Sequence, residues 1–327
     1  MKLKKIQAID GVHKGSFSRD GTRLALMDQN YTDVIEVGSG RKLSRIVVLD
    51  GIFLAAKFSP DAHSVVTAYR FGKNTGQSSI KVRLWDTVSG REKITLPVVD
   101  HDWRRIVEDL SISADGRLLA SNLGGIARLW EVATGKEVRR FVPENGPQDR
   151  QAERALLSPD GKWFAAYFIS PNERSYKVVH LWNLESGQHQ QFESEIYLDW
   201  QFSADSRLLA LTATVDKGKT TERSVAEIWD VLNAKRVKVI EPPREWRGAY
   251  TVAFSPDAKL LAIGGYKKFG IFSVESGELL VSETHHQAGF FQDSELPSEV
   301  SDIEFSPDGK VLLTGGNDHT VKLWRIT

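Results

Sequence analysis

Three aspartates recur at one fixed position of this sequence, four residues before a repeated serine: Asp109, Asp199 and Asp302. Carboxylates gathered in one tier could hold a cation or divide acid and base roles between them. Arg154 occupies the equivalent position in an intervening copy, which favours charge neutralisation and a structural role instead. The chain has no glycine-rich phosphate loop, nucleophile elbow or His-Glu-x-x-His motif. An enzymatic site would therefore depend on this acidic tier.

A second group of candidates combines tryptophan with arginine. The phrases Asp102-Trp103-Arg104-Arg105 and Glu245-Trp246-Arg247 each place an acid, a tryptophan and an arginine in succession. Tryptophan and arginine are the types most enriched at binding hot spots, so both phrases are candidates for anchoring a protein or peptide. The alternative is that each tryptophan packs in the core. Solvent exposure distinguishes the two.

Basic residues also gather in three insertions, at 70–77, 170–177 and 215–223. Their partner-binding candidates are Arg70, Lys73, Arg174 and Lys217. These loops are either a local basic surface for an acidic partner or phosphate backbone, or solvated hairpin tips. The connection 283–300 carries His285-His286 and two further candidates, Phe290 and Phe291, and could cover a channel or dock a partner. Adjacent histidines do not by themselves make a metal site.

An internal repeat must position these residues. Its clearest part is an apolar residue followed by Ser, a small residue or Pro, Asp and usually Gly, and its seven copies begin at Phe17, Phe58, Ile112, Leu157, Phe202, Phe254 and Phe305. In the last copy Pro307, Asp308 and Gly309 are typical of a tight turn. The alternating residues before it and the apolar run after it predict two antiparallel strands.

A large apolar residue follows each turn on a third predicted strand, and a further turn leads into a fourth. These slots hold Ile35, Trp85, Trp130, Trp182, Trp229, Phe272 and Trp324. Their separations are 50, 45, 52, 47, 43 and 52 residues, at or above the roughly 40–45 residues of a four-stranded propeller blade. Loop insertions explain the excess.

Leu84-Trp85-Asp86, Ile228-Trp229-Asp230 and the Ser-Pro-Asp-Gly turns make the chain resemble a diverged, bacterial-type member of the WD40 family. The resemblance covers nearly the whole chain and implies an all-β fold, a seven-bladed β-propeller of four-stranded antiparallel blades. The expected blades of this single domain (1–327) are approximately 10–49, 50–99, 104–142, 152–193, 196–241, 248–283 and 298–327 plus 2–9. The last repeat lacks a fourth strand, so we expect Leu3–Ile9 to pair with the C-terminal strand and close the ring.

Family blades typically carry a His before the first strand and an Asp before the tryptophan strand, joined in a buried hydrogen-bond network. Only Asn317-Asp318-His319-Thr320 resembles that turn, and a tryptophan, Trp103 or nearly Trp246, stands at the usual His position, about ten residues before the serine. We therefore expect the blades to depend on apolar packing. The resemblance implies fold and general role, and it carries over no partner-binding residue.

Composition narrows the function further. The 43 Lys and Arg residues balance 43 Asp and Glu residues, so no global field favours nucleic acid or an anionic membrane. The absence of cysteine excludes disulfides and thiolate chemistry, and no secretory signal is visible, which predicts a cytoplasmic protein. We predict a non-catalytic scaffold that binds a protein or peptide through rim loops, without cofactor or metal. The alternatives are an enzyme or small-ligand or metal binder using the acidic tier in the channel, and a nucleic-acid binder using the basic loops.

Overall fold

The computed structural model describes residues 1–48, 51–71, 79–96, 110–122, 125–144, 151–170, 172, 177–216, 218, 222–285 and 299–327. They form seven antiparallel sheets of four strands each. In six sheets the strands follow chain order, and in the seventh the N-terminal strand completes a sheet of C-terminal strands. The prediction of seven four-stranded propeller blades is confirmed.

Two compact units divide the described chain, residues 16–194 and residues 1–15 with 195–327. The first contains β2 (Lys14–Phe17, from Ser16 on), β3 (Arg23–Met27), β4 (Tyr31–Glu36) and β5 (Lys42–Val47). It continues with β6 (Gly51–Phe58), β7 (Ser64–Phe71), β8 (Ser79–Asp86) and β9 (Glu92–Leu96). Next are β10 (Leu110–Ile112), β11 (Leu118–Ser121), β12 (Ala127–Glu131) and β13 (Lys136–Phe141). It ends with β14 (Gln151–Leu157), β15 (Trp163–Ile169), β16 (Lys177–Asn183) and β17 (His189–Glu193).

The other unit holds the remaining three blades. The first is β18 (Ile196–Phe202), β19 (Leu208–Val215), β20 (Arg223–Asp230) and β21 (Lys235–Ile240). The second is β22 (Thr251–Phe254), β23 (Leu260–Gly264), β24 (Lys268–Ser273) and β25 (Leu279–Thr284). The third is β26 (Val300–Phe305), β27 (Val311–Gly316), β28 (Thr320–Ile326) and β1 (Leu3–Asp10). The sequence-based prediction of one domain over 1–327 remains a prediction.

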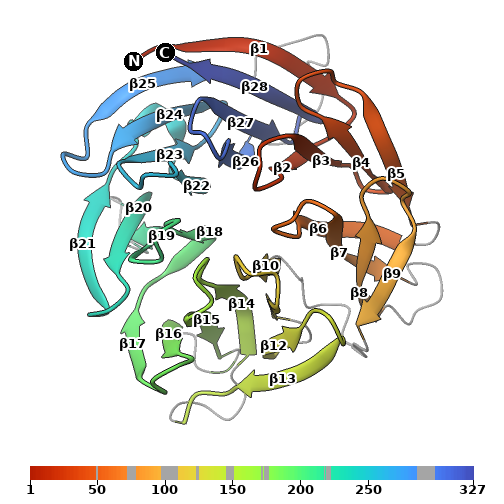
Figure 1. Cartoon of the computed structure of the whole chain (residues 1–327). Coiled ribbons are helices and arrows are strands. Elements are labelled where there is room, and N and C mark those ends of the chain that lie inside the picture. The colour runs from red at the N-terminus through yellow and green to blue at the C-terminus, as the bar shows by residue number, and fades with distance from the viewer. Residues whose placement is uncertain are drawn as a thin grey trace. The chain divides into compact units, whose positions relative to one another are not determined.

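Closure of the last blade by the N-terminal strand is confirmed. β1 runs antiparallel to β28, with Leu3 opposite Ile326 and Asp10 opposite Thr320. Figure 1 shows both termini at this edge, with β1 outside β28. Lys2 and Thr327 exchange two backbone hydrogen bonds of 2.7 and 3.0 Å. The pairing leaves β28 with a hydrogen-bonded neighbour on each side.

The repeated Ser-x-Asp turn joins the first and second strands of every blade. In the last copy the Ser306 hydroxyl donates to Asp308 Oδ1 (2.6 Å) and accepts from the backbone N–H of Val311 (2.9 Å). Asp308 Oδ1 also accepts the Lys310 N–H (3.0 Å). A bond from Ser to Asp recurs at Ser18, Ser59, Ser113, Ser158, Ser203 and Ser255. The repeat thus encodes a side-chain-stabilised turn.

The large apolar slots lie in the core. Their exposed fractions are at most 8% for all seven residues: Ile35, Trp85, Trp130, Trp182, Trp229, Phe272 and Trp324. Trp130 packs in a cluster with Leu84 and Leu96 of the preceding blade. The slots therefore contribute to contacts between successive blades as well as within one blade. None of the described helical segments is long and apolar enough to span a membrane.

Candidate binding surface

The connection that leads into β22 contains a short 3-10 turn, η2 (Arg244–Trp246). Trp246 is 1% exposed and lies edge-to-face with Phe272, the rings 5.9 Å apart at 74°. Gly270 makes room for it, because a Cβ there would lie 2.7 Å from Trp246 Cη2. The sequence allowed Trp246 to be either an exposed anchor or a core residue. The structure shows that it is a core residue. As a partner-binding anchor this residue was wrongly chosen, since its side chain is not on the surface.

Arg247 follows with a left-handed backbone (φ 56°) and an exposed side chain. Its guanidinium carbon lies 4.3 Å from the ring centroid of Tyr266, within the range of a cation–π contact. The ammonium of Lys267 lies 5.2 Å from the same centroid. Tyr266 and Lys267 form the turn between β23 and β24, closed by a 2.9 Å bond from the Gly265 N–H to the Lys268 carbonyl. Two cations thus share one aromatic ring.

The two loops that carry these cations are held together by backbone. The Tyr266 N–H donates to the Trp246 carbonyl at 2.7 Å. A Cβ at Gly265 would lie 2.6 Å from the Gly248 carbonyl oxygen and 2.9 Å from Trp246 Cβ, so only glycine allows this approach. Buried Trp246 and Gly265 therefore fix where Arg247 and Tyr266 stand.

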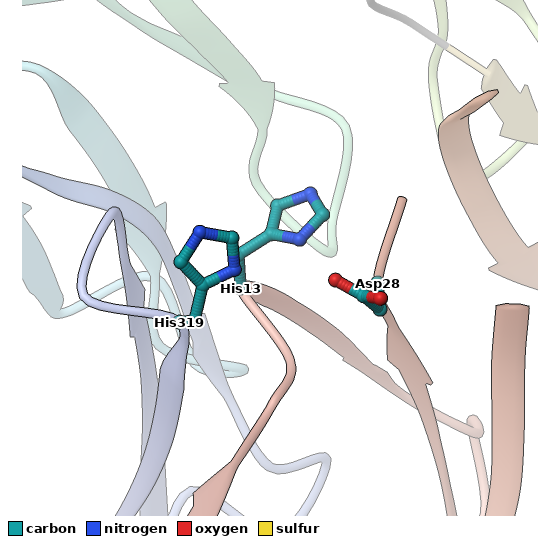
Figure 2. Close-up of side chains that lie close together, drawn as sticks. All are labelled: His13, Asp28 and His319. Atoms are coloured by element: carbon teal, nitrogen blue, oxygen red, sulfur yellow. The ribbon is translucent and has the colours of Figure 1, made fainter. Parts of the chain in front are cut away.

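Two histidines meet where the N-terminal segment joins the last blade. Figure 2 shows the imidazoles of His13, just before β2, and His319, in the turn between β27 and β28; their centroids are 6.1 Å apart at 72°. The backbone N–H groups of Gly11 and Val12 donate to the His319 carbonyl at 2.8 and 3.2 Å. Asp28, also drawn in Figure 2, follows β3 and belongs to the other compact unit. Two imidazoles fall short of the three or four ligands of a metal site.

The last blade contains a buried polar network that sequence reasoning missed. His285, 2% exposed, has Nδ1 2.8 Å from the Thr314 hydroxyl, and that hydroxyl accepts the Trp324 indole N–H at 2.8 Å. His285 Nε2 lies 3.4 Å from Asp318 Oδ1. Burial lowers the pKa of Lys322, which donates to the His285 carbonyl and has Nζ 3.6 Å from Asp318. His285 stands 21 residues before Ser306, whereas the usual His position is about ten residues before the serine. Its role could therefore not be recognised from the spacing of the repeat.

Other blades keep part of this network in addition to the apolar packing that the sequence predicts. The indole N–H donates to a hydroxyl of the second strand from Trp85 to Thr67 and from Trp130 to Ser121, both at 2.8 Å. Trp229 donates instead to buried Glu227 at 3.0 Å. A buried indole N–H needs such a partner.

A polar pair between the third and fourth strands accompanies the slots. It joins the residue two before the slot to the residue seven after it: Asp33–Lys42 (2.7 Å), Arg83–Glu92 (2.9 Å), Arg128–Glu137 (3.2 Å), His180–His189 (2.9 Å) and Glu227–Arg236 (2.5 Å). The acidic and basic partners exchange places between blades. The separation of nine residues along the sequence stays the same. A search at that spacing could have found the pairs.

The described members of the acidic tier make structural bonds. Asp199 Oδ2 accepts from the Thr251 hydroxyl (2.7 Å) and the Val252 N–H (3.0 Å) of the next blade. Asp302 Oδ2 accepts the Gly15 N–H at 2.7 Å. Arg154 is buried on β14, at 7% exposure. Both aspartates therefore join the first strand of one blade to backbone beyond it, which is the structural role that the sequence offered as the alternative.

The remaining predicted site residues are mostly outside the described part of the chain. Arg70 is half-buried on β7, opposite Ile52. The residues outside the description are Lys73, Trp103, Arg104, Arg105, Asp109, Arg174, Lys217, Phe290 and Phe291. Among the described candidates, the structure brings only Trp246 and Arg247 into one corner, and it adds Tyr266 and Lys267 to them.

Seven four-stranded blades with one repeated turn and one repeated slot define a seven-bladed β-propeller. A family model described as WD domain, G-beta repeat matches residues 291–325. The fold and this match support the resemblance to the WD40-repeat family.

Two relatives cover much of the chain. It is 24% identical over 255 residues to the small ribosomal subunit protein RACK1 of Candida albicans, which covers 68% of this chain and 77% of that protein. It is 28% identical over 220 residues to human apoptotic protease-activating factor 1, covering 64% of this chain and 15% of that protein. Neither match supports a bacterial type.

Proposed function

We propose that this protein is a non-catalytic scaffold that binds another protein or a peptide through the turns between second and third strands and through the connections between blades. The observation that carries the proposal is the contrast between these loops and the inner strands. Arg247 and Lys267 project from loops and make no ion pair with a described carboxylate. Asp199, on an inner strand, is already engaged by the next blade. Rigid blades that present cations on their loops are suited to binding.

The similarity to RACK1 supports the same role. That relative is named as a protein of the small ribosomal subunit, so it works within an assembly, and the match extends over most of both chains. We also propose a cytoplasmic location, as the sequence predicts. An enzyme or small-ligand site in the acidic tier is the less supported alternative, because Asp199 and Asp302 both accept backbone hydrogen bonds.

Capture followed by reconstitution tests this function. The tagged chain is incubated with native lysate, and the proteins retained are identified and then purified. Their affinity is measured for the wild type, for a variant with residues 72–78 replaced by Gly-Gly, and for Lys310→Asn, which alters the exposed first turn of the last blade. We expect a purified partner to bind the wild type and Lys310→Asn equally and the loop variant at least tenfold more weakly. Equal binding by all three would contradict the use of the connection 72–78.

A further inference from the structure

In the described part of the chain, two cations contact one aromatic ring. Arg247 lies 4.3 Å and Lys267 5.2 Å from the Tyr266 centroid. Neither takes part in an ion pair with a described acidic residue, whereas many exposed cations elsewhere do, such as Arg41 with Glu36 and Arg223 with Glu241. The negative face of the phenol ring offsets only part of their mutual repulsion.

The backbone that carries these two cations is anchored to the core. The Trp246 indole is packed against Phe272, and the Tyr266 N–H is bonded to the Trp246 carbonyl, so neither loop moves independently of the core. Arg247 and Lys267 both have left-handed backbones, at φ 56° and 59°, which non-glycine residues adopt only when the surrounding structure enforces it. An anchored backbone reduces the conformational entropy that these residues lose when an anion binds.

The charge around the ring is positive. The segments 244–248 and 265–268 contain Arg244, Arg247, Lys267 and Lys268 against Glu245. Glu299, which forms a backbone bridge with Tyr266, adds a second carboxyl. Burial raises the pKa of Glu299, and the four basic residues outnumber the two carboxyl groups. The surface is thus complementary to an anionic group.

We propose that Arg247, Tyr266 and Lys267 form a docking point for an acidic segment of a partner protein, whose carboxylates bind the guanidinium of Arg247 and the ammonium of Lys267. The inference rests on the proposed scaffold function and names the partner's chemistry. Arginine offers a planar fork that matches a carboxylate, and lysine adds a point charge. The Tyr266 ring, which both cations contact, supplies apolar area for the stem of a glutamate.

Fluorescence anisotropy with a labelled, capped peptide of alternating Glu and Gly tests the proposal at low salt. The charge-removing variant is Arg247→Asn with Lys267→Asn, because asparagine tolerates the left-handed backbone. The matched control is Lys259→Asn, an exposed lysine in the other turn of the same blade. Circular dichroism and the midpoint of thermal unfolding establish that each variant is folded.

We expect the double variant to bind the Glu-Gly peptide at least tenfold more weakly and Lys259→Asn to stay within twofold of the wild type. Tyr266→Leu should weaken binding and Tyr266→Phe should not. A Gln-Gly peptide should not bind. Equal affinity of double variant and wild type, or no binding of the Glu-Gly peptide by the wild type, would overturn the proposal.

A single-stranded oligonucleotide serves as a competing probe. If it binds more tightly than the peptide and loses affinity in the double variant, the docking point is for nucleic acid and the proposal is wrong. The capture and reconstitution experiment tests the scaffold function separately. A purified partner that binds the wild type supports that function, whatever the result with the peptide.

Discussion

The Thr314 hydroxyl, on the strand next to that of Trp324, accepts the Trp324 indole N–H at 2.8 Å. Thr314 stands two residues after the residue that pairs with Trp324 in the sheet. Thr314 pairs with Lys322, and Leu312 pairs with Trp324. The same hydroxyl lies 2.8 Å from His285 Nδ1. One buried oxygen therefore links the second strand, the third strand and the connection that enters the blade.

Removing this oxygen should destabilise the last blade. Thr314→Val keeps the shape of the side chain but leaves the Trp324 N–H and the His285 nitrogen without their common partner, and each buried unsatisfied group costs roughly 1–3 kcal/mol. We expect the free energy of unfolding in urea to fall by about 2–4 kcal/mol. Thr314→Ser keeps the oxygen and should cost less than half as much. Equal losses in the two variants would contradict the assignment of this stability to the hydroxyl group.

The blades could be predicted from the sequence because the residues that indicate them lie close together in the chain. The turn at Ser306 depends on Asp308, two residues away, and the seven copies differ little, so the hairpins and slots could be located by spacing. The pairing of β1 with β28 followed from a missing strand. These features need no knowledge of distant contacts.

The polar network and the candidate surface depend on distant contacts, and sequence reasoning failed there. His285 enters the network 29 residues before Thr314, outside any regular repeat spacing. The sequence left the burial of Trp246 open, because the glycine that makes room for its side chain, Gly270, lies on the distant strand β24. Tyr266 and Lys267 carry no motif, and only the bond from the Tyr266 N–H to the Trp246 carbonyl reveals that they adjoin Arg247.

Substitutions of the neighbouring residues Trp246 and Arg247 should differ in their effect on stability, because only Trp246 packs in the core. Trp246→Ala empties a fully buried site and should lower the free energy of unfolding by about 3–5 kcal/mol. Arg247→Asn changes an exposed residue, and we expect a change within about 0.5 kcal/mol. Chemical denaturation measures both. A large loss from Arg247→Asn would mean that the arginine holds the corner together, and it could then no longer be assigned to binding.

Asp199 should matter for stability through its acceptor oxygens. Asp199→Ala leaves the Val252 N–H and the Thr251 hydroxyl without their partner, and we expect a loss of about 1–3 kcal/mol. Asp199→Asn keeps one carbonyl oxygen to accept these bonds and should lose less. Thermal and urea unfolding of the two variants provide the comparison. If both variants unfold like the wild type, the carboxylate is not a structural link and the acidic-tier site regains support.

The stacked pair of His180 and His189 should make stability sensitive to mild acid. His189 Nε2 lies 2.9 Å from Nδ1 of His180, which is 1% exposed, and both rings stack on Trp182. Burial lowers the pKa of His189 below the usual 6.5, against a smaller opposing effect of Glu144. The unfolded chain therefore takes up the proton more readily than the folded one, and stability falls as the pH drops below about 6.5.

This pH effect can be measured as the change in thermal midpoint between pH 7.5 and pH 5.5, a window above the titration of ordinary carboxylates. We expect His189→Gln to reduce the change, because the proton-binding group that differs between the two states is gone. His63→Gln, at an exposed histidine in the turn after β6, is the matched control and should leave it as in the wild type. If His189→Gln kept the full wild-type change, another group would be responsible and the His180–His189 pair would be only a packing feature.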